Sequence, residues 1–115
     1  MDDDHAIRSL VTTLLTREEY DVDTASDGLE AVLKLGLSEY SLIVLDLMMP
    51  LVSGFEILQF LSEQRPAMLQ RVVVMTAVGE KDLQGLKGYD AVPVIRKPFD
   101  IADLMRAVRN STGAG

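Results

Sequence analysis

Hydrophobic and polar residues follow two kinds of pattern along this chain. In four segments apolar residues recur at helical spacing, and each segment follows residues that can cap a helix. The predicted caps are Asp4, the group 26–28, Ser53 and Asp100. The apolar faces predicted for these helices are, in order, Ile7, Leu10, Val11, Leu14 and Leu15; Leu29, Val32 and Leu35; Ile57, Leu58 and Leu61; Ile101, Leu104, Met105 and Val108.

Some of these helices have predicted ends, and one further segment is a weaker helix candidate. Gly36 is expected to stop the second helix, and the third must end before Pro66. Residues 80–87 form a short candidate that contains Gly85, which lowers helix propensity.

Four segments have strand patterns. Segments 41–45 and 72–75 are continuous apolar runs, typical of strands buried on both faces. Segment 21–25 alternates polar and apolar residues, which predicts a half-exposed strand. Segment 91–95 contains Pro93, which cannot donate to a ladder and therefore indicates an edge strand. We expect the two apolar runs to be central and the other two strands to be edges.

Strands and helices alternate along the chain, which predicts an α/β fold. Such alternation is typical of βα units, in which a parallel sheet has helices on both faces. We therefore expect a doubly wound parallel sheet. A length of 115 residues favours a single domain, which we place at 1–110, with 111–115 as a tail or the start of a linker.

Composition and charge exclude several classes of protein. The chain is 48% hydrophobic and 25% charged, as soluble globular domains are. A net charge of −7 argues against direct binding of nucleic acid and favours cations or basic protein surfaces as partners. The absence of cysteine and the single histidine exclude disulfides, thiolate zinc sites, multi-histidine metal centres and a Ser-His-Asp triad in the body of the chain. No signal-peptide pattern and no run of 18 apolar residues occurs, so we expect a cytoplasmic protein that does not contact a membrane.

Polar residues follow the predicted strands at the points where the strands end. Asp46 follows the first apolar run and Thr76 the second, while Lys97 lies just beyond the last strand. Asp2 and Asp3 stand directly before the first helix. Since ligands bind at the carboxyl ends of parallel strands, we expect these five side chains to converge on one rim of the sheet.

This set of side chains favours phosphoryl chemistry with a hard metal ion. Three neighbouring carboxylates repel one another unless they bind a cation, and oxygen ligands suit Mg²⁺ best. A lysine and a threonine beside them could stabilise a transferring phosphoryl group. Asp46 would then be the nucleophile that forms an acyl phosphate.

The chain resembles a receiver domain of a two-component response regulator, similar to the chemotaxis type, from Asp2 to Asn110. The family has a flavodoxin-like sheet with strand order 2-1-3-4-5. The segments that carry the resemblance are Asp2-Asp3, Leu42-Ile43-Val44-Leu45-Asp46-Leu47-Met48-Met49-Pro50, Ser53-Gly54, Val73-Val74-Met75-Thr76-Ala77 and Lys97-Pro98-Phe99.

The resemblance implies a magnesium site and a phosphoacceptor. Asp46 matches the residue that takes a phosphoryl group from a histidine kinase or phosphotransfer protein. Asp3 matches the carboxylate that binds Mg²⁺ directly, Asp2 acts mainly through a bound water, and the backbone carbonyl of Met48 is a further ligand.

It also implies contacts to the phosphoryl group and an output surface. Thr76 would donate a hydrogen bond, helped by the backbone N–H of Ala77, and Lys97 would pair with the phosphoryl charge. The family commonly has a cis peptide bond before the residue that matches Pro98. Phosphorylation would switch the surface of the fourth helix, fifth strand and fifth helix, which a downstream protein or effector domain would read.

One departure from the family concerns the sheet. Only Met1 stands where the family has an apolar strand, and that strand lies in the middle of the sheet. Three explanations are open: the natural chain starts upstream, a second chain pairs across the gap in a homo-oligomer, or the sheet closes up with four strands and displaces Asp2 and Asp3.

Other departures concern kinetics and output. Met48 and Val78 are apolar at positions where polar side chains can orient the attacking water, which predicts slow loss of the phosphoryl group. Val94 replaces the family's switch aromatic, so the usual threonine–aromatic coupling is in doubt.

Two other functions compete with the phosphoacceptor, which is not itself an enzyme. One is a pseudo-receiver that keeps the fold but serves only as a binding module. The other is a haloacid-dehalogenase-like phosphatase, which also uses an aspartyl nucleophile. That class requires a second aspartate two residues after the nucleophile, where this chain has Met48.

Overall fold

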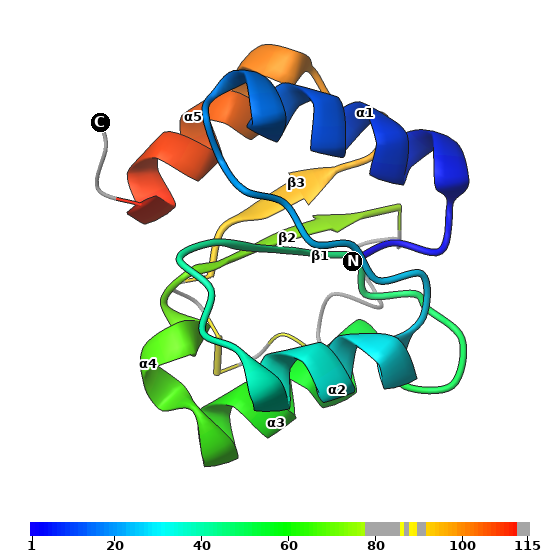
Figure 1. Ribbon diagram of the computed structural model, residues 1–115, viewed down its shortest axis with the longest axis vertical. Helices are drawn as coiled ribbons and strands as arrows, with labels where there is room; N and C mark the ends of the chain where they lie inside the picture. The colour runs from blue at the N-terminus through cyan, green and yellow to red at the C-terminus, as the bar shows by residue number, and fades with distance from the viewer. Residues whose placement is uncertain (78–85, 87, 90–91, 113–115) are drawn as a thin grey trace.

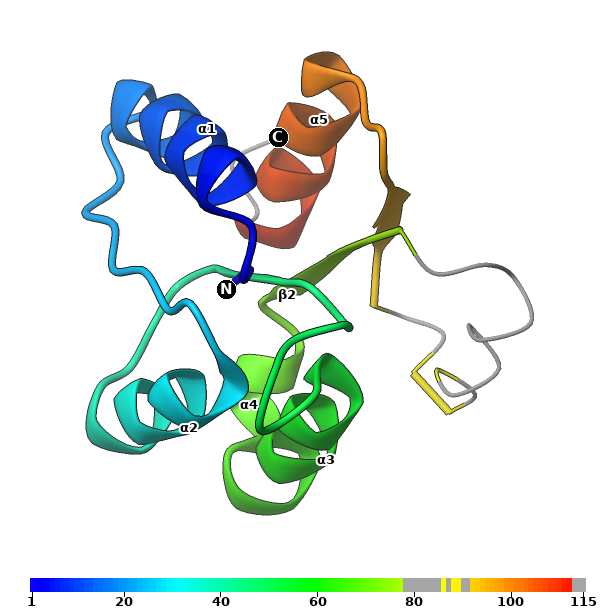
Figure 2. The same cartoon turned by 90° about the vertical axis from the view of Figure 1, so that its right-hand side faces the viewer.

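The computed structural model describes residues 1–77, 86, 88–89 and 92–112. In this part of the chain a central parallel sheet has helices on both faces, as Figure 1 shows, so the predicted α/β fold is confirmed. Helices α1 and α5 cover one face, and α2, α3 and α4 cover the other, on either side of β2 in Figure 2. The helices are α1 (His5–Arg17), α2 (Gly28–Leu37), α3 (Gly54–Gln64), α4 (Pro66–Leu69) and α5 (Ile101–Thr112).

The described sheet has three parallel strands in the order β1-β2-β3, namely β1 (Ile43–Leu45), β2 (Val72–Thr76) and β3 (Val94–Arg96). Every residue of β1 and β2 is buried, as their apolar sequences predicted. The edge position predicted for β3 is confirmed. The central position predicted for β1 is wrong among the described residues, because β1 also lies at an edge.

Strand β1 lies at an edge because the predicted strand 21–25 does not pair with it. It has no regular secondary structure, and the carbonyl of Ala25 accepts a backbone hydrogen bond from the N–H of Asp2 at 3.2 Å. Met1 lies between this segment and β1: its terminal nitrogen donates to the carbonyl of Val44 at 2.8 Å, and its carbonyl accepts from the N–H of Asp46 at 2.9 Å. The explanation in which the sheet closes up and displaces Asp2 is therefore wrong.

Local capping explains where the helices begin. The carboxylate of Asp4 accepts from the first N–H groups of α1, that of Asp27 from α2, and Ser53 forms a reciprocal capping box with Glu56. Helix α3 ends before Pro66, as predicted, but Pro66 then begins the short helix α4, since proline is favoured in a first helical turn. Helix α2 continues past Gly36 to Leu37.

Two hydrophobic clusters form the core, one on each face of the sheet. Three residues predicted to be inward-facing are instead exposed: Leu10, Leu29 and Ile101. In α2 the buried positions are Gly28, Ala31 and Leu35, so the inward face is rotated away from Leu29. No helix in the described ranges is long and apolar enough to cross a membrane. The candidate helix 80–87 lies outside the described residues except for its Leu86.

Candidate functional site

Asp46 directly follows β1, at the carboxyl end of the sheet. Its side chain is almost completely buried, with 4% of the residue exposed. One carboxylate oxygen, Oδ1, accepts the backbone N–H of Met48 at 3.2 Å. This hydrogen bond fixes the orientation of the carboxylate and leaves Oδ2 to face the other groups of the site.

Asp2 and Asp3 bring two further carboxylates to the same place. Asp2 is 2% exposed, and its Oδ1 accepts the backbone N–H of Asp4 at 2.9 Å, whereas Asp3 is exposed. Carboxylate oxygens of Asp2, Asp3 and Asp46 all lie within 4.8 Å of one another. The convergence predicted for these three residues is confirmed.

Lys97 joins the two buried carboxylates. Its Nζ lies 2.6 Å from Oδ2 of Asp2 and 3.3 Å from Oδ2 of Asp46. The backbone N–H of Lys97 donates to the carbonyl of Thr76 at 2.8 Å, which ties it to the end of β2. The peptide bond between Lys97 and Pro98 is cis, as the resemblance implied.

The charges in this small space shift the ionisation of their neighbours. Burial raises the pKa of Asp46, and the charge of Asp2 adds to that effect, while the Met48 N–H and Lys97 oppose it. Burial alone would lower the pKa of Lys97, but its hydrogen bond to Asp2 and the charges of both carboxylates outweigh burial and raise it. Burial lowers the pKa of the Met1 ammonium group to about 6.

The remaining predicted site residues lie at the same edge of the sheet. Thr76 is fully buried as the last residue of β2, and Ala77 follows it in an exposed position. The side chain of Met48 is 59% exposed, although its backbone N–H contacts Asp46. Val78, which was predicted to slow loss of the phosphoryl group, lies outside the described residues.

Two residues support the site although the sequence analysis assigned them no role. The guanidinium group of Arg8 donates to the backbone carbonyl of Asp2 at 2.9 Å and so holds the acidic pair against α1. Gly54 allows α3 to approach the site closely, because a Cβ there would lie 2.4 Å from the carbonyl oxygen of Asp46. In the sequence, Gly54 could have been found from its place directly after the capping residue Ser53. No local sequence pattern indicates the role of Arg8.

This set of groups fits a divalent cation. Three carboxylates and one ammonium group leave an excess of negative charge around the buried side chains of Asp2 and Asp46. Oxygen-only donors are the preference of Mg²⁺, which binds through one or two carboxylates together with water and phosphate oxygens.

Comparison with known proteins places the chain in a family. The family model described as the response regulator receiver domain matches residues 1–109. The chain is 39% identical over 111 residues to a transcriptional regulatory protein CpxR homolog from Haemophilus influenzae, covering 95% of this chain and 47% of that protein. It therefore spans about half the length of this curated relative.

Solved structures agree with this match. The response regulator TrrA from Thermotoga maritima, in complex with Mg²⁺-BeF, is 29% identical with a TM-score of 0.82, covering 96% of this chain and 93% of that one. A Francisella response regulator receiver domain is 29% identical with a TM-score of 0.81, covering 98% and 93%. The chain therefore belongs to the receiver domain family of two-component response regulators, as its strand-end residues indicated.

Proposed function

We propose that this receiver domain accepts a phosphoryl group on Asp46 and that the reaction requires Mg²⁺. The observation that carries the proposal is the approach of Lys97 to both buried carboxylates, with its Nζ 2.6 Å from Asp2 and 3.3 Å from Asp46. An aspartate buried beside a fixed ammonium group and two further carboxylates is suited to hold a transferred phosphoryl group.

The acidic residues would hold the metal. Asp3 and Asp46 would bind it directly, Asp2 would act mainly through a water molecule, and the carbonyl of Met48 would complete the protein ligands. When bound, Mg²⁺ neutralises charge on the carboxylates and on the oxygens of the phosphoryl group. Asp3 is the exposed member of the cluster and so is accessible to an incoming ion.

The transfer itself uses Oδ2 of Asp46. This oxygen attacks the phosphorus of a phosphoimidazole, the new O–P bond forms as the P–N bond breaks, and the electron pair stays on the imidazole nitrogen. Lys97 pairs with the charge of the phosphoryl oxygens, while the hydroxyl of Thr76 and the N–H of Ala77 donate to them. The N–H of Met48 holds Oδ1 and thereby keeps Oδ2 oriented for attack.

The phosphoryl donor is a histidine kinase or a phosphotransfer protein in the cytoplasm, and the domain acts as a phosphoacceptor rather than an enzyme. Its output is a population shift of the surface that includes β3 and α5, read by a downstream protein or effector domain. The Haemophilus relative is named as a transcriptional regulator, which makes control of transcription one such output.

Intact mass after incubation with acetyl phosphate and Mg²⁺ tests this function. We expect the protein to gain one phosphoryl group, and Asp46→Asn to gain none. Asp103→Asn is the matched control, because Asp103 is an exposed aspartate on α5 that pairs with Arg106. A folded protein that gains no phosphoryl group would refute the proposal and leave the pseudo-receiver as the function.

A further inference from the structure

Met48 lies beside the phosphoryl site and differs from the other methionines of the chain in its exposure. The residue is 59% exposed, and its backbone N–H donates to Oδ1 of Asp46 at 3.2 Å. The chain has six methionines. The other five are buried or half-buried: Met49 and Met105 are each 8% exposed, Met68 and Met75 are each 1% exposed, and Met1 is half-buried. An oxidant dissolved in water therefore reaches the sulfur of Met48 first.

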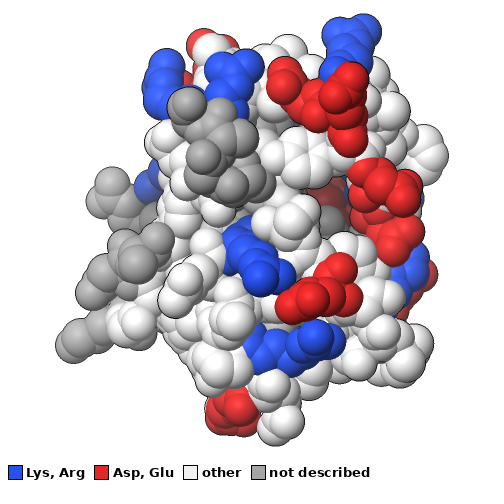
Figure 3. Space-filling view, turned by 60° about the vertical axis from the view of Figure 1, so that its left-hand side comes forward, with Lys and Arg blue, Asp and Glu red and all other residues white. Residues whose placement is uncertain are grey.

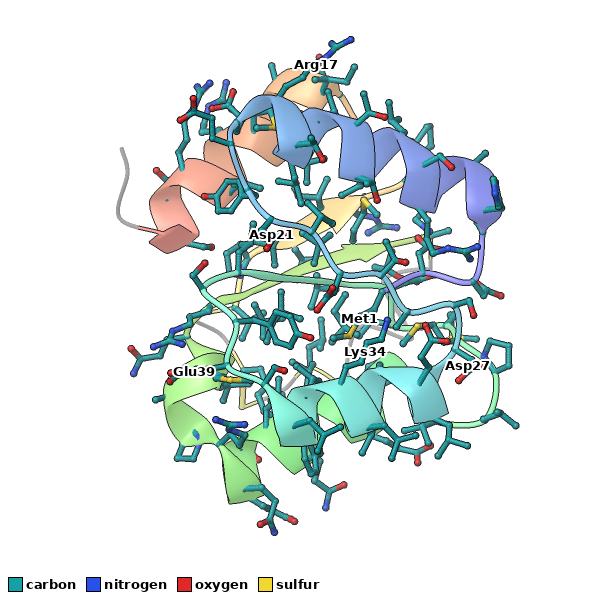
Figure 4. All side chains as sticks on the ribbon, in the orientation of Figure 1. Met1, Arg17, Asp21, Asp27, Lys34 and Glu39 are labelled. Atoms are coloured by element: carbon teal, nitrogen blue, oxygen red, sulfur yellow. The ribbon has the colours of Figure 1, made fainter. Side chains whose placement is uncertain are left out.

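The other methionines belong to the packing of the core. Met49 and Met68 are members of one hydrophobic cluster, and Met75 is a member of the other. Met1 packs against the first cluster and lies between the sheet and α2 in Figure 4. A sulfoxide at these positions would place a polar oxygen among apolar side chains, which is costly. Among the described residues Met48 is in neither cluster, so its oxidation leaves the core intact.

The charge around Met48 favours an uncharged oxidant. Carboxylate oxygens of Asp2, Asp3 and Asp46 lie within 4.8 Å of one another, with only the ammonium group of Lys97 to balance them. The whole chain has a net charge of −7, and acidic side chains gather along one side of the face shown in Figure 3. Anionic oxidants such as hypochlorite are repelled by this field, whereas a neutral peroxide is not. Hydrogen peroxide is thus the class of oxidant that suits the site.

We propose that Met48 is a site of reversible oxidation by peroxide and that its sulfoxide shortens the lifetime of the acyl phosphate on Asp46. This effect depends on the proposed function of Asp46 as phosphoacceptor. In the oxidation, a lone pair of the sulfur attacks one peroxide oxygen, and the S–O bond forms as the O–O bond breaks. The departing hydroxide takes the proton of the transferred oxygen and becomes water. Methionine sulfoxide reductases reverse such a change.

The sulfoxide oxygen supplies a hydrogen-bond acceptor that the thioether lacks. A thioether sulfur accepts only weakly. A water molecule that donates to the sulfoxide oxygen is held with a lone pair toward the phosphorus. Its attack breaks the bond between phosphorus and Oδ2 of Asp46, whose electron pair stays on the carboxylate, and releases inorganic phosphate. The hydrogen bond from the N–H of Met48 to Oδ1 fixes the start of this side chain next to the carboxylate that carries the phosphoryl group.

The test is treatment of the intact domain with hydrogen peroxide, followed by peptide mapping with mass spectrometry. We expect Met48 to gain one oxygen atom before any other methionine, with an unchanged circular dichroism spectrum. The oxidised domain is then phosphorylated with acetyl phosphate and Mg²⁺, and the acyl phosphate is followed by intact mass. We expect it to be lost several-fold faster than from the untreated domain. Methionine sulfoxide reductase should restore the original half-life.

Two variants separate Met48 from the rest of the chain. Met48→Leu has no sulfur at this position, so the half-life measured in this variant should be the same before and after peroxide. Met49→Leu is the matched control, because Met49 is the buried neighbour and leucine has a similar volume. Peroxide should still shorten the half-life in Met49→Leu. An equal response to peroxide in Met48→Leu and in the original sequence would contradict the assignment to Met48.

Oxidation of another methionine ahead of Met48, or an unchanged half-life in the domain oxidised at Met48, would overturn the proposal. An untreated domain that gains no phosphoryl group would instead refute the proposed function, and the effect on lifetime would fall with it. The peptide map does not depend on phosphorylation. It therefore distinguishes a wrong oxidation site from a failure of the phosphoacceptor function.

Discussion

Nζ of Lys97 lies closer to the carboxylate of Asp2, at 2.6 Å, than to that of the proposed phosphoacceptor Asp46, at 3.3 Å. The lysine is therefore shared between two carboxylates that repel each other. Burial raises the pKa of Asp46 and the charge of Asp2 adds to that effect, although Lys97 opposes it. Phosphoryl transfer would give this lysine a third partner and draw it toward Asp46.

Replacing the shared lysine should impair phosphorylation more than folding. In Lys97→Met the two buried carboxylates lose their counter-charge, so the pKa of Asp46 rises further and the phosphoryl oxygens lose an ammonium partner. We expect the rate of phosphorylation by acetyl phosphate to fall about 100-fold, the usual cost of removing one stabilising donor. Mass spectrometry over time measures the rate.

Lys34→Met is the matched control for that experiment. Lys34 forms an exposed ion pair with Glu30 on α2 at 3.6 Å, away from the carboxylate cluster. Its loss should leave the phosphorylation rate within about two-fold of the original, because exposed pairs of this kind contribute little. Equal rates in the two variants would refute the role assigned to Lys97.

Removing the charge of Asp46 should stabilise the fold at neutral pH. The folded-state pKa lies above the ordinary value of 3.8, so this charge destabilises the folded state increasingly as pH rises from 3.8 through the folded-state pKa. In Asp46→Asn we expect a gain on the order of 1 kcal/mol at pH 7, or roughly 4 °C in Tm. Calorimetry at pH 7 and pH 3 measures the difference.

The pH dependence identifies the cause of the gain. Below pH 3.8 Asp46 is protonated in both states, so the stabilisation by Asn should vanish there. Asp103→Asn serves as the exposed control and should change Tm little at either pH. A gain of equal size at both pH values would mean that burial of the charge is not its origin.

Gly54 is expected to tolerate no side chain. A Cβ at this position would lie 2.4 Å from the carbonyl oxygen of Asp46 and 2.5 Å from Cα of Leu47, and backbone atoms cannot move aside as a flexible side chain can. We expect Gly54→Ala to lose at least about 2 kcal/mol of stability and to slow phosphorylation by displacing Asp46. Urea denaturation and the mass assay measure both effects.

Alanine at Gly36 should stabilise the protein, whereas alanine at Gly54 should destabilise it. A Cβ at Gly36 would meet nothing within 4 Å, and the residue lies inside α2. Alanine at Gly36 should therefore add roughly 0.5–1 kcal/mol through its higher helix propensity. If Gly36→Ala and Gly54→Ala change stability equally, the close approach of α3 to the site is not what constrains Gly54.

Local sequence patterns were enough to predict much of the fold. The apolar runs marked β1 and β2 because every residue of these strands is buried. Residues such as Asp4 and Ser53 marked helix starts because capping involves atoms only a few residues apart. The polar residues that follow the strands predicted the rim, since parallel strands end on the same side.

What the patterns did not predict depends on contacts between distant residues. Leu29 matches an apolar helical face, yet the approach of Gly28 to Val52 turns α2 so that Leu29 is 50% exposed. The preference of Lys97 for Asp2 joins residues at opposite ends of the chain. No periodicity or capping rule carries such information.

The side chain of Met48 should control how long the phosphoryl group remains on Asp46. It is 59% exposed beside the site, so Met48→Asn should change stability by less than about 0.5 kcal/mol. An amide at this position can orient a water molecule toward the phosphorus, which the thioether cannot. We expect the acyl phosphate to be lost several-fold faster, as followed by intact mass after removal of acetyl phosphate.

Leu51→Asn in the same loop is the control for that experiment. Leu51 is 74% exposed and has a φ of 70°, which asparagine tolerates. The half-life of the acyl phosphate in this variant should match that in the original protein. An unchanged half-life in Met48→Asn, or equal acceleration in both variants, would show that water orientation at Met48 does not set the lifetime.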